Sequence, residues 1–238
     1  MAMLGLVAFA CAAWAGLAVV QGHYLTALIA VGATVFWLAP LRVWWIMPSV
    51  VARAVCDAEG TTIRVDRRVD ILLFIGVLTG ALALGAGGVL GAMNKLDIPL
   101  PPDIAPMFAM AFIGPALVFV VALVLTVKRG GVGYIRLTAE GFKFVEAFST
   151  ASGEWAQVVD VTDKAPEDMP AKNPVAMVMA DGDVKMIKEP GLYSRDGRAI
   201  LRFVRFYWQN IDDRVELTDG RALDRLRAVQ LEEATDAA

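Results

Sequence analysis

Residues 107–127 read MFAMAFIGPALVFVVALVLTV and contain no charged side chain over 21 positions. As an α-helix, this segment spans about 31 Å, which matches the hydrocarbon core of a bilayer. Its twelve Leu, Ile, Phe and Val residues favour insertion by about 6 kcal/mol, at about 0.5 kcal/mol each, before the cost of Gly114 and Pro115. The segment therefore predicts a membrane-spanning helix.

Three further segments of similar character precede it, at residues 3–20, 25–47 and 71–93. From residue 130 onward the sequence is charged and mixed, as in a globular domain. We therefore predict an α+β membrane protein. Residues 1–129 form a domain of four transmembrane helices with a cytosolic loop at 48–69, and residues 130–238 form a small antiparallel β domain with C-terminal helices.

The charge distribution predicts how the chain crosses the membrane. Lys and Arg residues gather in the segment 48–69 and directly after residue 127, whereas the turn at 21–24 has none and the segment 94–106 has only Lys95. The positive-inside rule then predicts a multi-pass protein of the inner (plasma) membrane with both termini in the cytoplasm. The net charge of −3 is unfavourable for a nucleic-acid-binding protein, which needs a basic excess.

Few residues offer catalytic or ligand-binding chemistry. Arg42 is the only charged residue within the spans and lies near Trp44 and Trp45. It either contacts an ion or a substrate, or it extends toward the headgroups from a belt of interfacial tryptophans. His23 is the only histidine, and Cys11 and Cys56 have no nearby cysteine partner in the sequence. We therefore predict that the protein is not an enzyme, binds no cofactor or metal ion, and does not act alone as a carrier.

Small residues share one face of the third span. At about 100° per residue they fall within an arc of roughly 80°, and they are Gly76, Gly80, Ala83, Gly87 and Gly91. A face of small residues lets another helix approach closely. That helix belongs either to this chain or to another membrane protein, so these residues are candidate partner contacts.

The second half alternates short β-prone runs with turns. We predict strands at 134–138, 142–148, 154–161, 176–180 and 184–188, with a hairpin turn at Asp181-Gly182-Asp183 and a loop at 163–174. An amphipathic helix is predicted at 198–210 or slightly beyond, with Ile200, Val204, Tyr207 and Ile211 on its apolar face, and a weaker helix at 217–233.

A row of arginines accompanies the amphipathic helix. Spacings of three, four and three residues place it largely opposite the apolar face, and its members are Arg195, Arg198, Arg202 and Arg205. Phe203 lies between Arg202 and Arg205 in the sequence, and Phe206 directly follows Arg205. The row either binds anionic headgroups or acidic residues of a cytosolic partner, or it is an ordinary solvated face.

The run YIRLTAEGF at 134–142, followed by GEW at 153–155 and VVDV at 158–161, resembles bacterial pleckstrin-homology (PH)-like domains. Five predicted strands instead of the usual seven would make a trimmed barrel. Ala139 and Glu140 stand where a phosphoinositide-binding domain would have basic residues.

Four spans followed by such a domain also resemble small actinobacterial membrane proteins described as lipid uptake coordinators, which associate with mammalian-cell-entry (Mce) transporters. This resemblance implies a non-catalytic accessory or scaffolding subunit of an envelope lipid-import complex. Its partners would be other integral membrane subunits, such as a transporter permease or its ATPase, together with membrane lipid. The alternative is a membrane lipid-binding module that works without a protein partner.

Overall fold

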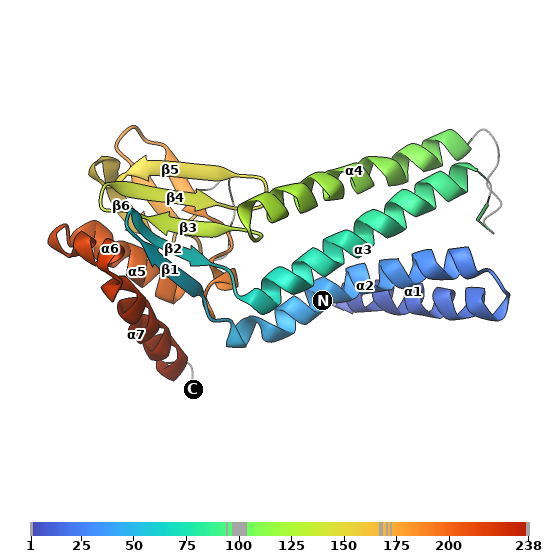
Figure 1. Cartoon of the computed structure of the whole chain (residues 1–238), viewed down its shortest axis with the longest axis horizontal. Coiled ribbons are helices and arrows are strands. Elements are labelled where there is room, and N and C mark those ends of the chain that lie inside the picture. Colours follow the sequence, from blue (N-terminus) through green and yellow to red (C-terminus); the bar gives the residue numbers. More distant parts are fainter. Residues whose placement is uncertain are drawn as a thin grey trace. The chain divides into compact units, whose positions relative to one another are not determined.

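The computed structural model describes residues 2–93, 95–96, 104–166, 169, 171 and 173–236. It divides into two compact units (Figure 1). Unit 1 comprises Met1–Trp45 and Ile71–Gly130, and unit 2 comprises Ile46–Asp70 and Gly131–Ala238. The predicted combination of four long apolar helices with small antiparallel β-sheets is confirmed.

Unit 1 is built from four helices: α1 (Ala2–Val20), α2 (Tyr24–Ile46), α3 (Arg67–Ala92) and α4 (Ala105–Arg129). Within the described residues, these four are long and apolar enough to cross a membrane, so the chain is a membrane protein. The helix α4 ends where Gly130 adopts left-handed φ and ψ angles of 69° and 31°, the usual glycine helix stop. The predicted connection at 94–106 lies mostly outside the described residues.

The larger sheet of unit 2 has five antiparallel strands in sequence order. They are β1 (Arg53–Asp57), β2 (Gly60–Arg64), β3 (Tyr134–Leu137), β4 (Gly141–Val145) and β5 (Thr150–Glu154). The segment 48–69, predicted as the loop between the second and third spans, contains the β-hairpin of β1 and β2. It is ordered because β2 pairs with β3, where Ile63 lies opposite Ile135 and both side chains are buried.

The smaller sheet contains β6 (Val158–Thr162), β7 (Val175–Met179) and β8 (Val184–Ile187). Gly182 forms the β7–β8 turn with a φ of 86°, as the Asp-Gly pair predicts. The single strand predicted at 154–161 is divided instead between β5, a short 3₁₀ turn at Trp155–Gln157 and β6. Trp155 is buried, and its indole N–H donates a hydrogen bond of 2.8 Å to the Thr138 carbonyl.

The C-terminal region forms α5 (Arg198–Gln209), α6 (Glu216–Asp219) and α7 (Arg221–Asp236). The buried face of α5, which includes Ile200, Phe203, Val204 and Tyr207, packs against β6 and α7. Ile211, predicted on that face, is 69 % exposed because α5 ends at Gln209 and the helical periodicity ends with it.

Candidate functional site

The small-residue face of α3 packs within the chain. A Cβ atom added to Gly76 would lie 2.6 Å from the Ala39 Cβ of α2, and one added to Gly80 would lie 2.6 Å from the ring of Phe36 and 3.0 Å from that of Phe119. The helices that approach these glycines closely are α2 and α4 of the same chain, which is the first of the two alternatives left open by the sequence.

The rest of that face is also covered. Ala83 and Gly91 are buried, and a Cβ on Gly32 of α2 would lie 3.2 Å from the Ala83 Cβ. Gly87 has more room, since a Cβ added there would lie 3.5 Å from Phe112 and 3.7 Å from Ile29. Gly88 has less room than Gly87, because a Cβ added to Gly88 would lie 2.8 Å from the Ile113 side chain. Sequence reasoning missed Gly88 because it falls outside the arc shared by the other small residues.

The arginines of α5 do not form one free basic surface. Arg205 is half-buried and donates two hydrogen bonds, of 3.1 and 2.7 Å, to the Val161 carbonyl at β6. Arg202 pairs with Glu232 of α7 at 3.7 Å, and Arg198 pairs with Asp196 at 3.2 Å. Arg195 precedes α5 in the sequence. It is half-buried and lines a small hollow beside Glu233.

The two phenylalanines next to these arginines, Phe203 and Phe206, also make contacts within the chain. Phe203 is fully buried, and the Arg225 guanidinium lies 3.8 Å from the centre of the Phe206 ring. Two arginines of the row therefore join α5 to its neighbours: Arg205 contacts β6 and Arg202 contacts α7. Arg195, Arg198 and Arg202 keep enough exposure to contact a partner.

This division of roles predicts different effects of two otherwise similar substitutions. Arg205→Gln should lower the free energy of unfolding of the full-length protein by about 1 kcal/mol, because the hydrogen bonds to the Val161 carbonyl are lost. Arg202→Gln should change it by about 0–0.5 kcal/mol, because its ion pair is exposed. Denaturant unfolding followed by tryptophan fluorescence would measure both values. Equal effects of the two substitutions would contradict the assignment of Arg205 to the core contact.

Unit 2 contains a polar cluster around Asp70 that sequence reasoning missed. The Asp70 carboxylate accepts hydrogen bonds from the Arg53 guanidinium at 2.7 Å and from the Val132 backbone N–H at 3.0 Å. Arg53 also donates to the Val65 carbonyl at 3.1 Å. Arg53 begins β1, Val65 follows β2, Asp70 lies in the first turn of α3, and Val132 precedes β3. The cluster therefore links the three chain segments that connect α2, α3 and α4 to neighbouring strands.

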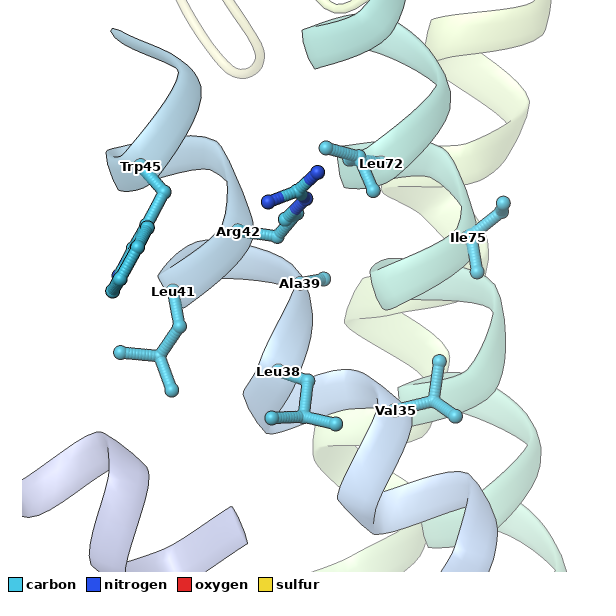
Figure 2. Close-up of a pocket in the computed structure, with 8 residues that line it drawn as sticks. All are labelled: Val35, Leu38, Ala39, Leu41, Arg42, Trp45, Leu72 and Ile75. Atoms are coloured by element: carbon cyan, nitrogen blue, oxygen red, sulfur yellow. The ribbon is translucent and has the colours of Figure 1, made fainter.

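In unit 1, an apolar hollow of about 590 Å³ lies between α2 and α3. Figure 2 shows Ala39 and Arg42 of α2 directed toward α3, where the Leu72 side chain extends toward Arg42 and Ile75 lies farther along the helix. Leu41 and Trp45 extend from another side of α2 in the same view. Seven of the eight lining residues are apolar or aromatic, and Arg42 supplies the one charge.

A second apolar hollow, of about 410 Å³, lies along the same pair of helices. Its lining runs from Leu25 on α2 and Leu90 on α3 to Val35, which also lines the first hollow. The two hollows therefore follow each other along the α2–α3 seam. We call them together the α2–α3 groove, with Arg42 near one end.

Arg42 differs from most other arginines of the described chain. Its side chain is exposed, and among the described residues no hydrogen-bond or ion-pair partner is found for it. Sequence reasoning identified this charge but could not show that it borders a groove. An elongated apolar hollow with a single cation can accommodate an amphiphile with an anionic end.

The next residues to consider are those whose side chains could bind a metal ion, and the two cysteines. Among those residues, no group of three His, Cys, Asp or Glu side chains could hold a metal ion. Cys11 and Cys56 are both free thiols. The Cys56 thiol contacts the Leu217 carbonyl at 3.2 Å.

No protein-family model, curated protein or solved structure matches this chain. The resemblance to PH-like domains and to lipid uptake coordinators stays a prediction from the sequence.

Proposed function

We propose that this chain is a non-catalytic accessory or scaffolding subunit of an envelope lipid-import complex of the Mce type. In this proposal, it is a multi-pass protein of the inner membrane with both termini in the cytoplasm, and unit 2 is a PH-like domain. The resemblance supports the assignment to this class of complex. The packing of the spans supports a role that depends on association with other molecules.

The observation that carries the proposal is the light packing of α4. Of the 18 residues in the most apolar stretch of α4, only 6 % are buried within the chain. Its exposed side chains include Met110, Leu117, Val121 and Val127. Helices in membranes associate mainly through close van der Waals packing. The surface of α4 therefore leaves ample area for a helix of another subunit, such as the permease.

The connections between helices and strands also suit a scaffold. The helix α2 leads into β1, β2 leads into α3, and α4 leads into β3, and these three strands are neighbours in one sheet. Arg198 and Arg202 of α5 are exposed and provide cations for an acidic partner surface, such as that of an ATPase subunit. One chain could in this way bind a membrane partner and a cytosolic partner.

Site-specific photo-crosslinking in native membranes tests this proposal. A photoreactive residue at Leu117, which is 60 % exposed on α4, should give a crosslink to another membrane protein that mass spectrometry identifies. The same residue at the neighbouring Ala116, which is 6 % exposed, is the matched control and should give several-fold less of that product. Lipid adducts alone at Leu117, with no co-purifying protein, would contradict the accessory role.

The alternative is a membrane lipid-binding module without a protein partner. The α2–α3 groove favours it, because an apolar hollow beside a cation fits a lipid better than a polar solute. Lipid binding by the purified chain is measured separately from its crosslinking to other proteins. The two functions can therefore be distinguished.

A further inference from the structure

We propose that the α2–α3 groove binds one anionic membrane lipid. The headgroup pairs with Arg42, and an acyl chain lies along the apolar lining toward Val35 (Figure 2). The occupant is defined by its chemistry: a phosphate or carboxylate headgroup on a hydrocarbon chain. This inference requires no partner complex and stands on unit 1 alone.

The first argument is charge complementarity. No acidic residue lines either hollow of the groove, and no described residue pairs with Arg42. By contrast, Arg53 pairs with Asp70 and Arg225 with Glu216. A guanidinium close to hydrocarbon is costly unless it finds an anion or water. It is also the side chain best suited to hold a phosphate or carboxylate through two parallel hydrogen bonds.

The second argument is the position of Arg42 along its helix. It lies about one helical turn before Trp45, and Trp44 and Trp45 are both exposed. Exposed tryptophans near the end of a span mark the interface between hydrocarbon and headgroups. Arg42 therefore lies close to the level at which lipid phosphates are found, with the apolar part of the groove on the hydrocarbon side.

The third argument is the length and composition of the groove. Leu25 and Arg42 are 17 residues apart on α2, which corresponds to about 25 Å along the helix. Val35 lines both hollows, so an acyl chain that starts near Arg42 can continue along α2 and α3. A bilayer supplies molecules of this shape at high local concentration, which favours a lipid over a peptide.

Native mass spectrometry of the full-length protein in detergent provides the test. Purified protein is titrated with phosphatidylglycerol, with zwitterionic phosphatidylcholine, and with inorganic phosphate as a competitor. The wild type should retain one phosphatidylglycerol molecule in preference to phosphatidylcholine, and inorganic phosphate should not displace it. Arg42→Gln should weaken phosphatidylglycerol binding about tenfold or more, the size expected when a charge-assisted hydrogen bond is lost.

Two matched controls separate a specific site from general attraction. Lys128→Gln removes one positive charge near the end of α4 and should leave phosphatidylglycerol retention unchanged. Val35→Trp should fill the groove and weaken the binding of both lipids, whereas Leu117→Trp on α4 should weaken the binding of neither. Thermal unfolding in the same detergent confirms that each variant is folded. If Val35→Trp does not fold, the Arg42 and Lys128 variants decide the question.

Three results would overturn the proposal. They are unchanged binding by Arg42→Gln, an equal loss with Lys128→Gln, and a photo-crosslink from Leu38 in the groove to protein instead of lipid. Each of these can occur while the α4 crosslinking experiment succeeds. A failed lipid site therefore leaves the proposed accessory role intact, and the reverse also holds.

Discussion

Replacing Gly80 by leucine is expected to destabilise unit 1 by about 3 kcal/mol or more, and replacing it by alanine by about 1–3 kcal/mol. Even a methyl group at this position would lie 2.6 Å from the Phe36 ring and 3.0 Å from the Phe119 ring. The two rings are 5.4 Å apart between centroids and belong to different helices. Something in the seam between α2, α3 and α4 must therefore shift to accommodate the added group.

Gly87→Ala is the matched control on the same face of α3. A methyl group there would find Phe112 at 3.5 Å and Ile29 at 3.7 Å, which are ordinary van der Waals distances. We expect a change of about 0.5 kcal/mol or less, because nothing needs to move. Reversible unfolding in mixed micelles with increasing denaturing detergent would compare the alanine variants. Similar stability of Gly80→Ala and Gly87→Ala would contradict the packing described for α3.

This result affects how partner binding must be tested. If a Gly80 variant lost a partner subunit, the loss would follow from the disrupted contact among α2, α3 and α4 of the same chain. The sequence showed that the small residues share a face, because helical periodicity is a local property. It could not show which helix covers that face, since Phe36 and Phe119 are distant in the sequence and meet Gly80 only in the folded unit.

The same distinction explains which parts of the fold were predictable. Each span is recognisable from its own residues, because crossing a bilayer requires one long apolar run. The hairpin of β1 and β2 was missed because its stability depends on pairing with β3, about seventy residues later. β5 was missed because Thr150–Glu154 reads TASGE, which has little β propensity and is held by pairing with β4.

The candidate contact residues show a similar limit. Arg198, Arg202 and Arg205 all belong to α5, and their spacing predicts that they share a side of it. Whether each arginine is free depends on groups elsewhere in the chain, namely the Val161 carbonyl and Glu232. Arg42 was identifiable as an isolated charge in an apolar span. The groove beside it requires a second helix, so only the structure could reveal it.

Replacing Glu216 by alanine is expected to destabilise unit 2 by about 1–3 kcal/mol, because it removes a nearly buried carboxylate that accepts hydrogen bonds from the part-exposed Arg225 and from the Tyr207 hydroxyl. The Glu216 side chain is 8 % exposed. Its carboxylate accepts two hydrogen bonds of 2.8 Å from Arg225 on α7 and one of 3.0 Å from the Tyr207 hydroxyl on α5. Without it, the Tyr207 hydroxyl loses its acceptor and the Arg225 guanidinium loses its counter-charge.

The position of Glu216 explains why this effect should extend beyond the helices. Glu216 begins α6, and the carbonyl of the next residue, Leu217, accepts a hydrogen bond of 2.7 Å from the Thr61 hydroxyl of β2. The short helix α6 also packs against β1 and β2. Loss of the carboxylate should therefore weaken the contact between the C-terminal helices and the hairpin. Glu232→Gln is the control, because its ion pair with Arg202 is exposed and worth about 0–1 kcal/mol.

The stabilisation by Glu216 should depend on pH in a defined direction. The hydrogen bonds from Arg225 hold the pKa of Glu216 below its ordinary value of 4.5, although burial opposes them. The folded state therefore binds this proton less readily than the unfolded state. The stabilisation is fully present above pH 4.5 and is lost as the pH falls through the folded pKa. The difference in unfolding free energy between wild type and Glu216→Gln should thus be constant near neutral pH and shrink on acidification below pH 4.5. A difference that grows on acidification would show that burial, and not Arg225, controls this carboxylate.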